Sequence, residues 1–163
     1  MRGIVLGHSF RLDAMVLEHN DRLVLVGVTS SEASGTYAVE DAFELDMPTR
    51  ILDLDEAGEW LVMIAENEGV DHPVVSQMAM SHSLLGLAFV DDWCISVRKK
   101  KMSQLLLVHE MAHLVCSNGG HGREFRTQVV TFVRRYVSLA HAVRLHEMYV
   151  AAGLGVESFS STK

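Results

Sequence analysis

The sequence predicts an α+β domain in which a small antiparallel sheet packs on a buried helix, with further helices at its flanks. Two patterns lead to this prediction. Short segments rich in β-branched and aromatic residues lie between residues 74 and 97, and three helical patterns follow between residues 103 and 152. Strands that are gathered before helices, and do not alternate with them, favour the α+β class.

The chain has the length of one ordinary domain. Its 163 residues are 48% hydrophobic and 21% charged, with only 2 prolines. The nearest thing to a boundary is the polar stretch 30–35. We therefore predict an N-terminal β-hairpin appendage over residues 1–34, the main domain over residues 35–157 and a C-terminal tail over residues 158–163.

The first part of the chain is expected to hold a hairpin and two helices. Met15–Leu17 and Leu23–Val26 are apolar and flank a polar turn, which is typical of a hairpin. A short helix is predicted over Tyr37–Leu45. The next helix should begin at an aspartate that caps it and should end just before a glycine. Its candidate caps and its stop are Asp53 or Asp55 and Gly69.

The remaining elements are three strands and three helices. The strands are expected at Val74–Val75, Leu87–Val90 and Trp93–Val97, and the helices at Ser103–Ser117, Gly122–Ser138 and Leu139–Ala152. The first helix is apolar nearly all round and should be buried in the core. Asn118–Gly120 and Gly153 provide stops after the first and third helices. The second helix should expose Arg126, Arg134 and Arg135 on its polar face.

Composition argues against several classes of protein. A formal charge of −7 disfavours a general nucleic-acid surface, which needs clustered Lys and Arg, and the one basic run, Arg98–Lys101, is interpreted as a solvated turn. No apolar run approaches the roughly 18 residues of a membrane span, and the N-terminal apolar stretch is too short for a signal peptide. We therefore expect a cytoplasmic protein without a membrane partner. Cys94 and Cys116 make no disulfide framework.

The residues that carry chemistry are His109-Glu110-Met111-Ala112-His113, an H-E-x-x-H motif. On a helix, residues four apart share one face, so both imidazoles can reach one tetrahedral metal. The carboxylate of Glu110 then lies beside the metal without ligating it, where it can take a proton from metal-bound water. Two histidines and a glutamate are costly to bury in an apolar helix without partners, and a divalent cation would supply one.

A catalytic zinc needs a third protein ligand, and His121 is the leading candidate. Gly119-Gly120 turns the chain after the helix, which can bring His121 back toward it, and Phe125 can anchor the following helix to the core. Glu124 and Glu147 are alternative ligands, and Cys116 is interpreted as a packed thiol that could also approach the metal. Three side chains are candidates for stabilising a tetrahedral oxyanion: Tyr136, Tyr149 and His141.

His-Glu-Met-Ala-His, seven further residues and then His121-Gly122-Arg123-Glu124-Phe125 resemble a known pattern. It is the H-E-L-A-H … H-G-x-x-F pattern of small zinc metallohydrolases predicted in actinobacteria and their phages, which are similar to SprT-like minimal zincins. The likeness extends from Tyr37–Asp41 to Gly153–Val156 and leaves out about the first 34 residues. It implies a zincin-like fold over residues 35–157. It also implies that His109, His113 and His121 bind zinc and that Glu110 is the general base.

The resemblance further implies that Trp93–Val97 lines a cleft where an extended peptide adds as a further strand. The expected function is therefore that of a zinc-dependent metallohydrolase, a metallopeptidase acting on a peptide or protein. Two alternatives stay open: a zinc-bearing binding or regulatory protein, and a hydrolase of small amides. An intact Glu110 disfavours the first alternative. The acidic composition and the lack of a C-x-x-C pair disfavour the DNA-repair role of SprT-like proteases.

Overall fold

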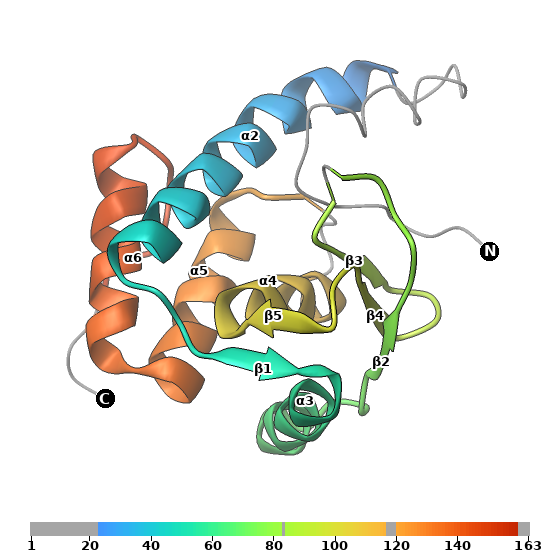
Figure 1. Ribbon diagram of the computed structural model, residues 1–163. Coiled ribbons are helices and arrows are strands. Elements are labelled where there is room, and N and C mark those ends of the chain that lie inside the picture. The colour runs from blue at the N-terminus through green and yellow to red at the C-terminus, as the bar shows by residue number, and fades with distance from the viewer. Residues whose placement is uncertain (1–22, 83, 117–119, 160–163) are drawn as a thin grey trace.

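The computed structural model describes residues 23–82, 84–116 and 120–159, with side chains from residue 31 onwards. The elements, in chain order, are α2 (Leu23–Asp46), β1 (Ile51–Asp53), α3 (Leu54–Glu68), β2 (Val74–Gln77), β3 (Gly86–Phe89), β4 (Cys94–Val97), β5 (Lys101–Ser103), α4 (Gln104–Val115), α5 (Arg123–Phe132), the π-helical turn η1 (Val133–Val137) and α6 (Leu139–Ala151). Helix α4 lies in the middle, with the strands on one side and α2, α5 and α6 on the other (Figure 1). The predicted α+β class is confirmed. Within these ranges, no helix has both the length and the apolar character needed to cross a membrane.

Helix α2 replaces part of the predicted hairpin. It runs without a break from Leu23 to Asp46, so the strand predicted at Leu23–Val26 is wrong, while Met15–Leu17 lies outside the described residues. A short apolar run fits a strand and a buried helix equally well, and the helical stretch that follows decides between them. The helix predicted at Tyr37–Leu45 is confirmed as its C-terminal half. The division of the chain at residue 34 stays a prediction, although α2 continues through that residue.

Helix α3 begins and ends as its sequence predicts. Asp53, and not Asp55, is the N-cap: its side chain accepts a hydrogen bond from the Glu56 amide, while the Glu56 side chain accepts one from the Asp53 amide. At the other end Gly69 adopts a left-handed conformation with φ of 68°, which glycine tolerates better than other residues. The capping residues therefore fix both ends of α3.

The strands form two small sheets. One contains the strands in the order β2-β4-β3, with β4 parallel to β2 and antiparallel to β3, so the prediction of a purely antiparallel sheet is wrong for this pair. The second sheet is the antiparallel pair β1-β5, which the sequence did not reveal because each strand has only three residues. Strand β4, predicted to line a cleft where a peptide adds as a further strand, is paired on both sides, and among the described strands β2 and β3 lie at the edges of this sheet. A peptide therefore cannot pair directly with β4, and the cleft along Trp93–Val97 stays a prediction.

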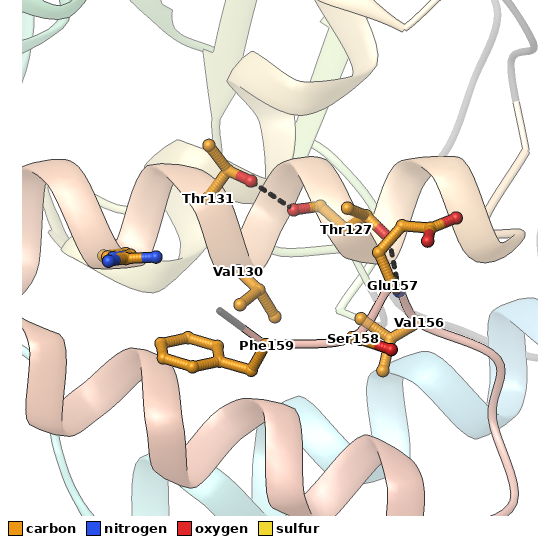
Figure 2. Close-up of a pocket in the computed structure, with 8 residues that line it drawn as sticks. Thr127, Val130, Thr131, Val156, Glu157, Ser158 and Phe159 are labelled. Atoms are coloured by element: carbon orange, nitrogen blue, oxygen red, sulfur yellow. Dashed lines mark hydrogen bonds between the residues drawn. The ribbon is translucent and has the colours of Figure 1, made fainter. Parts of the chain in front are cut away.

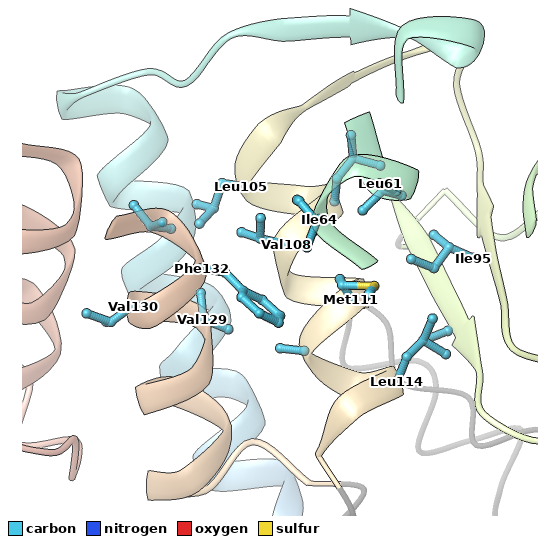
Figure 3. Packing of buried hydrophobic residues seen from close by; sticks show 14 of the residues in the cluster. Leu61, Ile64, Ile95, Leu105, Val108, Met111, Leu114, Val129, Val130 and Phe132 are labelled. Carbon is cyan, nitrogen blue, oxygen red and sulfur yellow. The ribbon is translucent and has the colours of Figure 1, made fainter. Parts of the chain in front are cut away.

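Helix α4 is the core helix that its composition predicts. Ser103 caps its first turn by accepting a hydrogen bond from the Leu106 amide. Figure 3 shows Val108 and Met111 of α4 between Phe132 of α5 and Ile95 of β4. Each such side chain contributes roughly 1.5–3 kcal/mol when fully buried. The helix ends at Val115, and residues 118 and 119 of the stop predicted at Asn118–Gly120 lie outside the described residues.

The C-terminal helices confirm the predicted segments with one correction. Helix α5 passes through the π-helical turn η1 into α6, which Ser138 caps through its bond from the His141 amide. Gly153 follows α6 with φ of 72°. Arg126, predicted on the exposed face of its helix, is only 1% exposed. The periodicity of α5 alone gives no sign of the acceptors that surround this guanidinium, and these belong to other segments.

Candidate metal centre

Helix α4 and the start of α5 bring three histidines together. His109 and His113 lie one turn apart on α4, and their Nε2 atoms are separated by 3.2 Å. The Nε2 atom of His121, just before α5, lies 3.2 Å from each of them. All three side chains are at most 1% exposed. The three residues predicted as ligands therefore converge, and this group could bind a metal ion.

Hydrogen bonding alone does not account for this triangle of nitrogens. In a neutral imidazole, Nε2 carries either a proton or a lone pair. Among three such atoms at least two are in the same state, so at least one contact joins two protons or two lone pairs. A cation that accepts all three lone pairs removes this conflict. Tetrahedral coordination with bonds of about 2.0–2.1 Å places ligand nitrogens about 3.3–3.4 Å apart, close to the 3.2 Å observed here.

Glu40 of α2 orients the first histidine. Its Oε2 atom lies 2.7 Å from Nδ1 of His109, and its Oε1 atom accepts a hydrogen bond of 2.6 Å from the Tyr149 hydroxyl. Burial lowers the pKa of His109 to about 3, so the ring is neutral. With the proton on Nδ1 and directed at Glu40, Nε2 presents its lone pair to the other two histidines. Sequence reasoning missed Glu40, which lies 69 positions from His109.

Arg126 holds the third histidine from behind. Its guanidinium donates to the backbone carbonyl of His121, to the carbonyl of Gly155 at 2.7 Å and to Thr36 Oγ1 at 3.4 Å. The Thr36 hydroxyl itself lies within 3.4 Å of the His121 carbonyl. An ion pair of 3.4 Å joins Arg126 to Glu32. The segment that carries His121 is thereby tied to α2 and to the chain after α6.

Glu110 lies on the β3 side of the centre and is fully buried. Among the described residues, neither of its carboxylate oxygens has a hydrogen bond of ordinary geometry. A Cβ atom on Gly86 would lie 2.8 Å from Oε1 of Glu110, so only glycine fits at that position of β3 without a shift. Burial, and then the charge of Glu40, raise the pKa of Glu110 well above its usual range, while a weak hydrogen bond from the Ala88 backbone, outside ordinary geometry, acts in the opposite direction.

Two aromatic rings enclose the histidines. Phe125 stacks on His113 with ring centroids 4.3 Å apart and is buried, in agreement with its predicted role as an anchor for α5. Tyr37 of α2 packs against His109 and His121, with centroid distances of 5.3 and 4.7 Å. Burial, followed by the charges of Glu110 and Glu40, raises the pKa of Tyr37. The phenol therefore stays protonated beside the centre.

The alternative ligands lie outside the cluster. Within the described part of the chain, the group able to hold a metal consists of the three histidines. Glu124 and Glu147 are exposed on their helices. Cys116 is a free, buried thiol at the end of α4, and burial, together with the charge of Glu124, raises its pKa to about 11. A thiol in that state is a poor metal ligand, because the thiolate is the form that coordinates.

The candidates for oxyanion stabilisation are engaged elsewhere. Tyr136 donates to Glu68 at 2.5 Å, and Nδ1 of His141 lies 2.7 Å from Ser138 Oγ. Tyr149 is completely buried and bonded to Glu40, so it reaches the centre only through that carboxylate. The structure therefore does not bring these three residues to the histidines. Tyr37, on α2, is the tyrosine that lies against them.

A separate cavity of about 170 Å³ lies between α5 and the segment after α6. Figure 2 shows Thr127, Thr131 and Val130 of α5 facing Val156 and Phe159 across it. None of its lining residues belongs to the group formed by the three histidines and Glu110. This cavity is therefore distinct from the candidate metal centre.

No family model, curated protein or solved structure matches the chain. The resemblance to SprT-like zincins therefore stays a prediction, and the function has to be argued from the site itself.

Proposed function

We propose that this protein is a zinc-dependent metallohydrolase with a zincin-like fold, and that it hydrolyses peptide bonds. The observation that carries the proposal is the 3.2 Å triangle of Nε2 atoms, together with the buried Glu110 that follows His109 on α4. A structural metal site has no need of such a carboxylate, whereas a hydrolase needs a base next to its metal.

The donor set favours zinc among the common divalent cations. Among the described residues the group able to hold a metal consists of three histidines, and three imidazole ligands with one position left open are typical of catalytic zinc sites. When bound, zinc would lower the pKa of water and polarise a carbonyl group. Nδ1 of His109, held by Glu40, adds the outer carboxylate contact that commonly accompanies a ligating histidine.

Glu110 is the proposed general base. Its carboxylate would take a proton from the attacking water and deliver it to the leaving amine nitrogen. Burial and the charge of Glu40 make this carboxylate hold a proton strongly. A nearby cation acts in the opposite direction and favours the ionised form. The two effects together would adjust the basicity of Glu110 toward neutral pH, where a general base works best.

The edge of β3 that faces away from β4 lies against the proposed base. The Arg98 amide donates to the Leu85 carbonyl at 3.0 Å, so residue 85 directs its backbone groups toward β4. Because these directions alternate along an antiparallel strand, Gly86 and Ala88 direct theirs away from β4. Both residues lie beside Glu110. Both are also buried, so the outward edge of β3 faces Glu110 and α4, and the choice of a peptide as substrate rests on the resemblance to metallopeptidases.

One observation favours a second candidate function. Glu110 and the three histidines are all at most 1% exposed. Such burial is typical of metal sites that stabilise a fold, so a zinc-bearing binding protein is the alternative to an enzyme. The two candidates differ in whether Glu110 is needed for a reaction.

Replacement of Glu110 by glutamine separates them. Glu110→Gln keeps the shape of the side chain but cannot accept a proton, and loss of a general base typically lowers the rate by about 10²–10⁴. We expect the variant to be folded and loaded with zinc, but inactive. Wild type and variant should be compared on a broad peptide library, with mass spectrometry of the products and elemental analysis of both proteins.

Chelation and re-addition of zinc serve as the controls for this experiment. Activity that disappears with the chelator and returns with zinc ties cleavage to the metal. A zinc-loaded wild type that cleaves no peptide in the library would favour the binding-protein candidate. Undiminished cleavage by Glu110→Gln would show that Glu110 is not the base.

A further inference from the structure

Helix α2 presents a polar stripe to the metal centre. Glu32, Thr36 and Glu40 are spaced four residues apart, so they lie on one face of the helix. Thr36 and Glu40 are buried, which is unusual for polar side chains unless they have partners. Each of the three contacts a metal-centre histidine directly or through Arg126. The stripe therefore connects α2 with two of the three histidines.

The contact of Glu40 has the properties of an orienting interaction. The carboxylate is 2% exposed, and each of its oxygens has a partner, Nδ1 of His109 and the hydroxyl of Tyr149. A buried carboxylate needs such partners, because its desolvation is otherwise too costly. Tyr149 belongs to α6, so the orientation of His109 depends on the packing of α2 against α6.

The contacts of Arg126 act on the backbone of the third histidine. The His121 carbonyl accepts from both Arg126 and Thr36. The guanidinium also donates hydrogen bonds to the Gly155 carbonyl and to the Glu32 carboxylate. Arginine has five donors in a rigid fork, so one side chain can fix three segments relative to one another. His121 is thereby held against α2, although it lies 85 positions from Thr36.

We propose that Glu40 and Arg126 are positioning residues of the metal centre, which dock His109 and His121 onto helix α2 and so couple metal affinity to the docking of that helix. The proposal rests on the metal-binding part of the proposed function and not on hydrolysis. The coupling is reciprocal: if docked α2 strengthens zinc binding, bound zinc strengthens the docking of α2 to the same extent.

Helix α2 also supplies a matched control. Glu44 lies one turn beyond Glu40 on the same helix, and its carboxylate accepts hydrogen bonds from the amide and the hydroxyl of Thr49. It is half-buried and has no contact with the histidines among the interactions of the described residues. Glu44→Gln therefore perturbs a carboxylate contact of α2 without touching the metal centre.

The experiment measures zinc affinity of the full chain by competition with a chromophoric chelator. Loss of an outer-shell contact typically weakens metal binding by about 10–100-fold. We expect a weakening of this size for Glu40→Gln, partial recovery for Glu40→Asp, and less than about 3-fold change for Glu44→Gln, which lies outside that shell. Wild-type affinity in Glu40→Gln, or an equal loss in Glu44→Gln, would overturn the proposal.

Two further measurements separate positioning from general stability. The visible spectrum of the cobalt-substituted protein reports ligand geometry, and it should change in Glu40→Gln and in Arg126→Lys but not in Glu44→Gln. Hydrogen exchange of α2 amides should slow on addition of zinc to the wild type. The proposed coupling would be contradicted if zinc left the hydrogen exchange of the α2 amides unchanged. It would also be contradicted if the cobalt spectra of Glu40→Gln and Arg126→Lys both matched that of the wild type.

Tyr149→Phe is a milder substitution that tests the proposal even if the Glu40 or Arg126 variants fail to fold. It removes only the hydroxyl that donates to Glu40, and it should weaken zinc binding by a few-fold, less than the about 10–100-fold of a direct contact. No weakening in this folded variant would also count against the proposal. Because none of these readouts is catalytic, a zinc-binding wild type without hydrolytic activity would refute the proposed function and leave this inference standing.

Discussion

Two buried carboxylates, one on each side of the candidate metal centre, differ in their hydrogen bonding. On the α2 side, both oxygens of Glu40 are hydrogen-bonded, to His109 and to Tyr149. On the β3 side, Glu110 is buried to the same degree, yet within the described ranges neither of its oxygens has a bond of ordinary geometry. Glu40 contacts His109, and Glu110 is the next residue to His109 on α4. The difference therefore comes from their partners and not from their burial.

This difference separates positioning from chemistry. A carboxylate with both oxygens engaged keeps one orientation and stabilises the fold, because each partner would otherwise be buried without a bond. A carboxylate without partners is costly to the fold but is free to exchange a proton. The comparison predicts that the same substitution on the two sides will change stability in opposite directions.

The largest expected effect is that of Glu40→Met. The substitution leaves Nδ1 of His109 and the Tyr149 hydroxyl without acceptors, at about 1–3 kcal/mol for each buried group. We expect the metal-free protein to lose roughly 2–5 kcal/mol of unfolding free energy in urea denaturation. Glu110→Met, in contrast, removes a buried carboxylate whose one hydrogen-bonding contact among the described residues, with the Ala88 backbone, is not of ordinary geometry, and should raise stability by about 1 kcal/mol. Equal losses of unfolding free energy in Glu40→Met and Glu110→Met would contradict the proposed difference between the two carboxylates.

Gly86→Ala tests the β3 side by steric means. The new Cβ would come within 2.8 Å of Glu110 Oε1 and within 3.2 Å of its Cγ and Cδ atoms, so the glutamate or the strand must shift. Overpacking of a buried site typically costs about 1–3 kcal/mol. We expect that loss in urea denaturation, together with a lower kcat if the protein is an enzyme.

Gly58→Ala is the control for this substitution. Gly58 lies within α3, and a Cβ there meets no atom within 4 Å. Alanine is a better helix former than glycine by roughly 0.8–1.0 kcal/mol, so this variant should be more stable than the wild type. A stable Gly86→Ala variant with normal kcat would mean that Glu110 has more room than its contacts suggest.

The smallest effect is expected for a carboxylate that is paired but partly exposed. Although burial raises the pKa of Glu68, the hydrogen bonds from Tyr136 and Arg135 outweigh it and hold the pKa below its usual range. A lowered pKa stabilises the fold above the unfolded value near 4.5, and this contribution disappears as the pH falls through the folded value. Solvent screening limits the contribution of Glu68 to the free energy of unfolding to less than about 1 kcal/mol.

Urea denaturation of Glu68→Gln at two pH values checks this expectation. At pH 7 the variant should be slightly less stable than the wild type, and the two should converge once the pH falls below the lowered pKa of Glu68 in the folded protein, because the wild-type carboxyl is then protonated. A difference that persists in acid would show that the pair contributes through packing and not through charge.

The elements that could be predicted from the sequence depend on local patterns. The apolar periodicity of α4, the capping aspartate of α3 and the spacing of His109 and His113 all involve residues a few positions apart. These patterns also predicted His121, because a glycine turn limits how far the chain can travel after α4. Helix geometry therefore accounts for the pairing of His109 with His113, and the short separation in sequence limits how far His121 can lie from them.

What could not be predicted depends on contacts between distant segments. Glu40 meets His109 across 69 positions, and Arg126 meets Thr36 across 90. An arginine on a helix looks exposed until the acceptors that surround it are known, and a short apolar run such as Leu23–Val26 fits two structures equally well. The parallel pairing of β2 with β4 is likewise set by topology and not by strand composition.

The contact between Glu40 and Tyr149 joins residues that are 109 positions apart, and this separation has a consequence for biosynthesis. Once α4 has left the ribosome, His109 and His113 are neighbours on a single helix. The acceptor that orients His109 can be fixed only after Tyr149 has emerged as well, and His121 is held only after Gly155 has followed. Translation adds about 5–20 residues per second. For a few seconds the nascent chain therefore carries two histidines of the candidate metal centre before the structure that orients them can form.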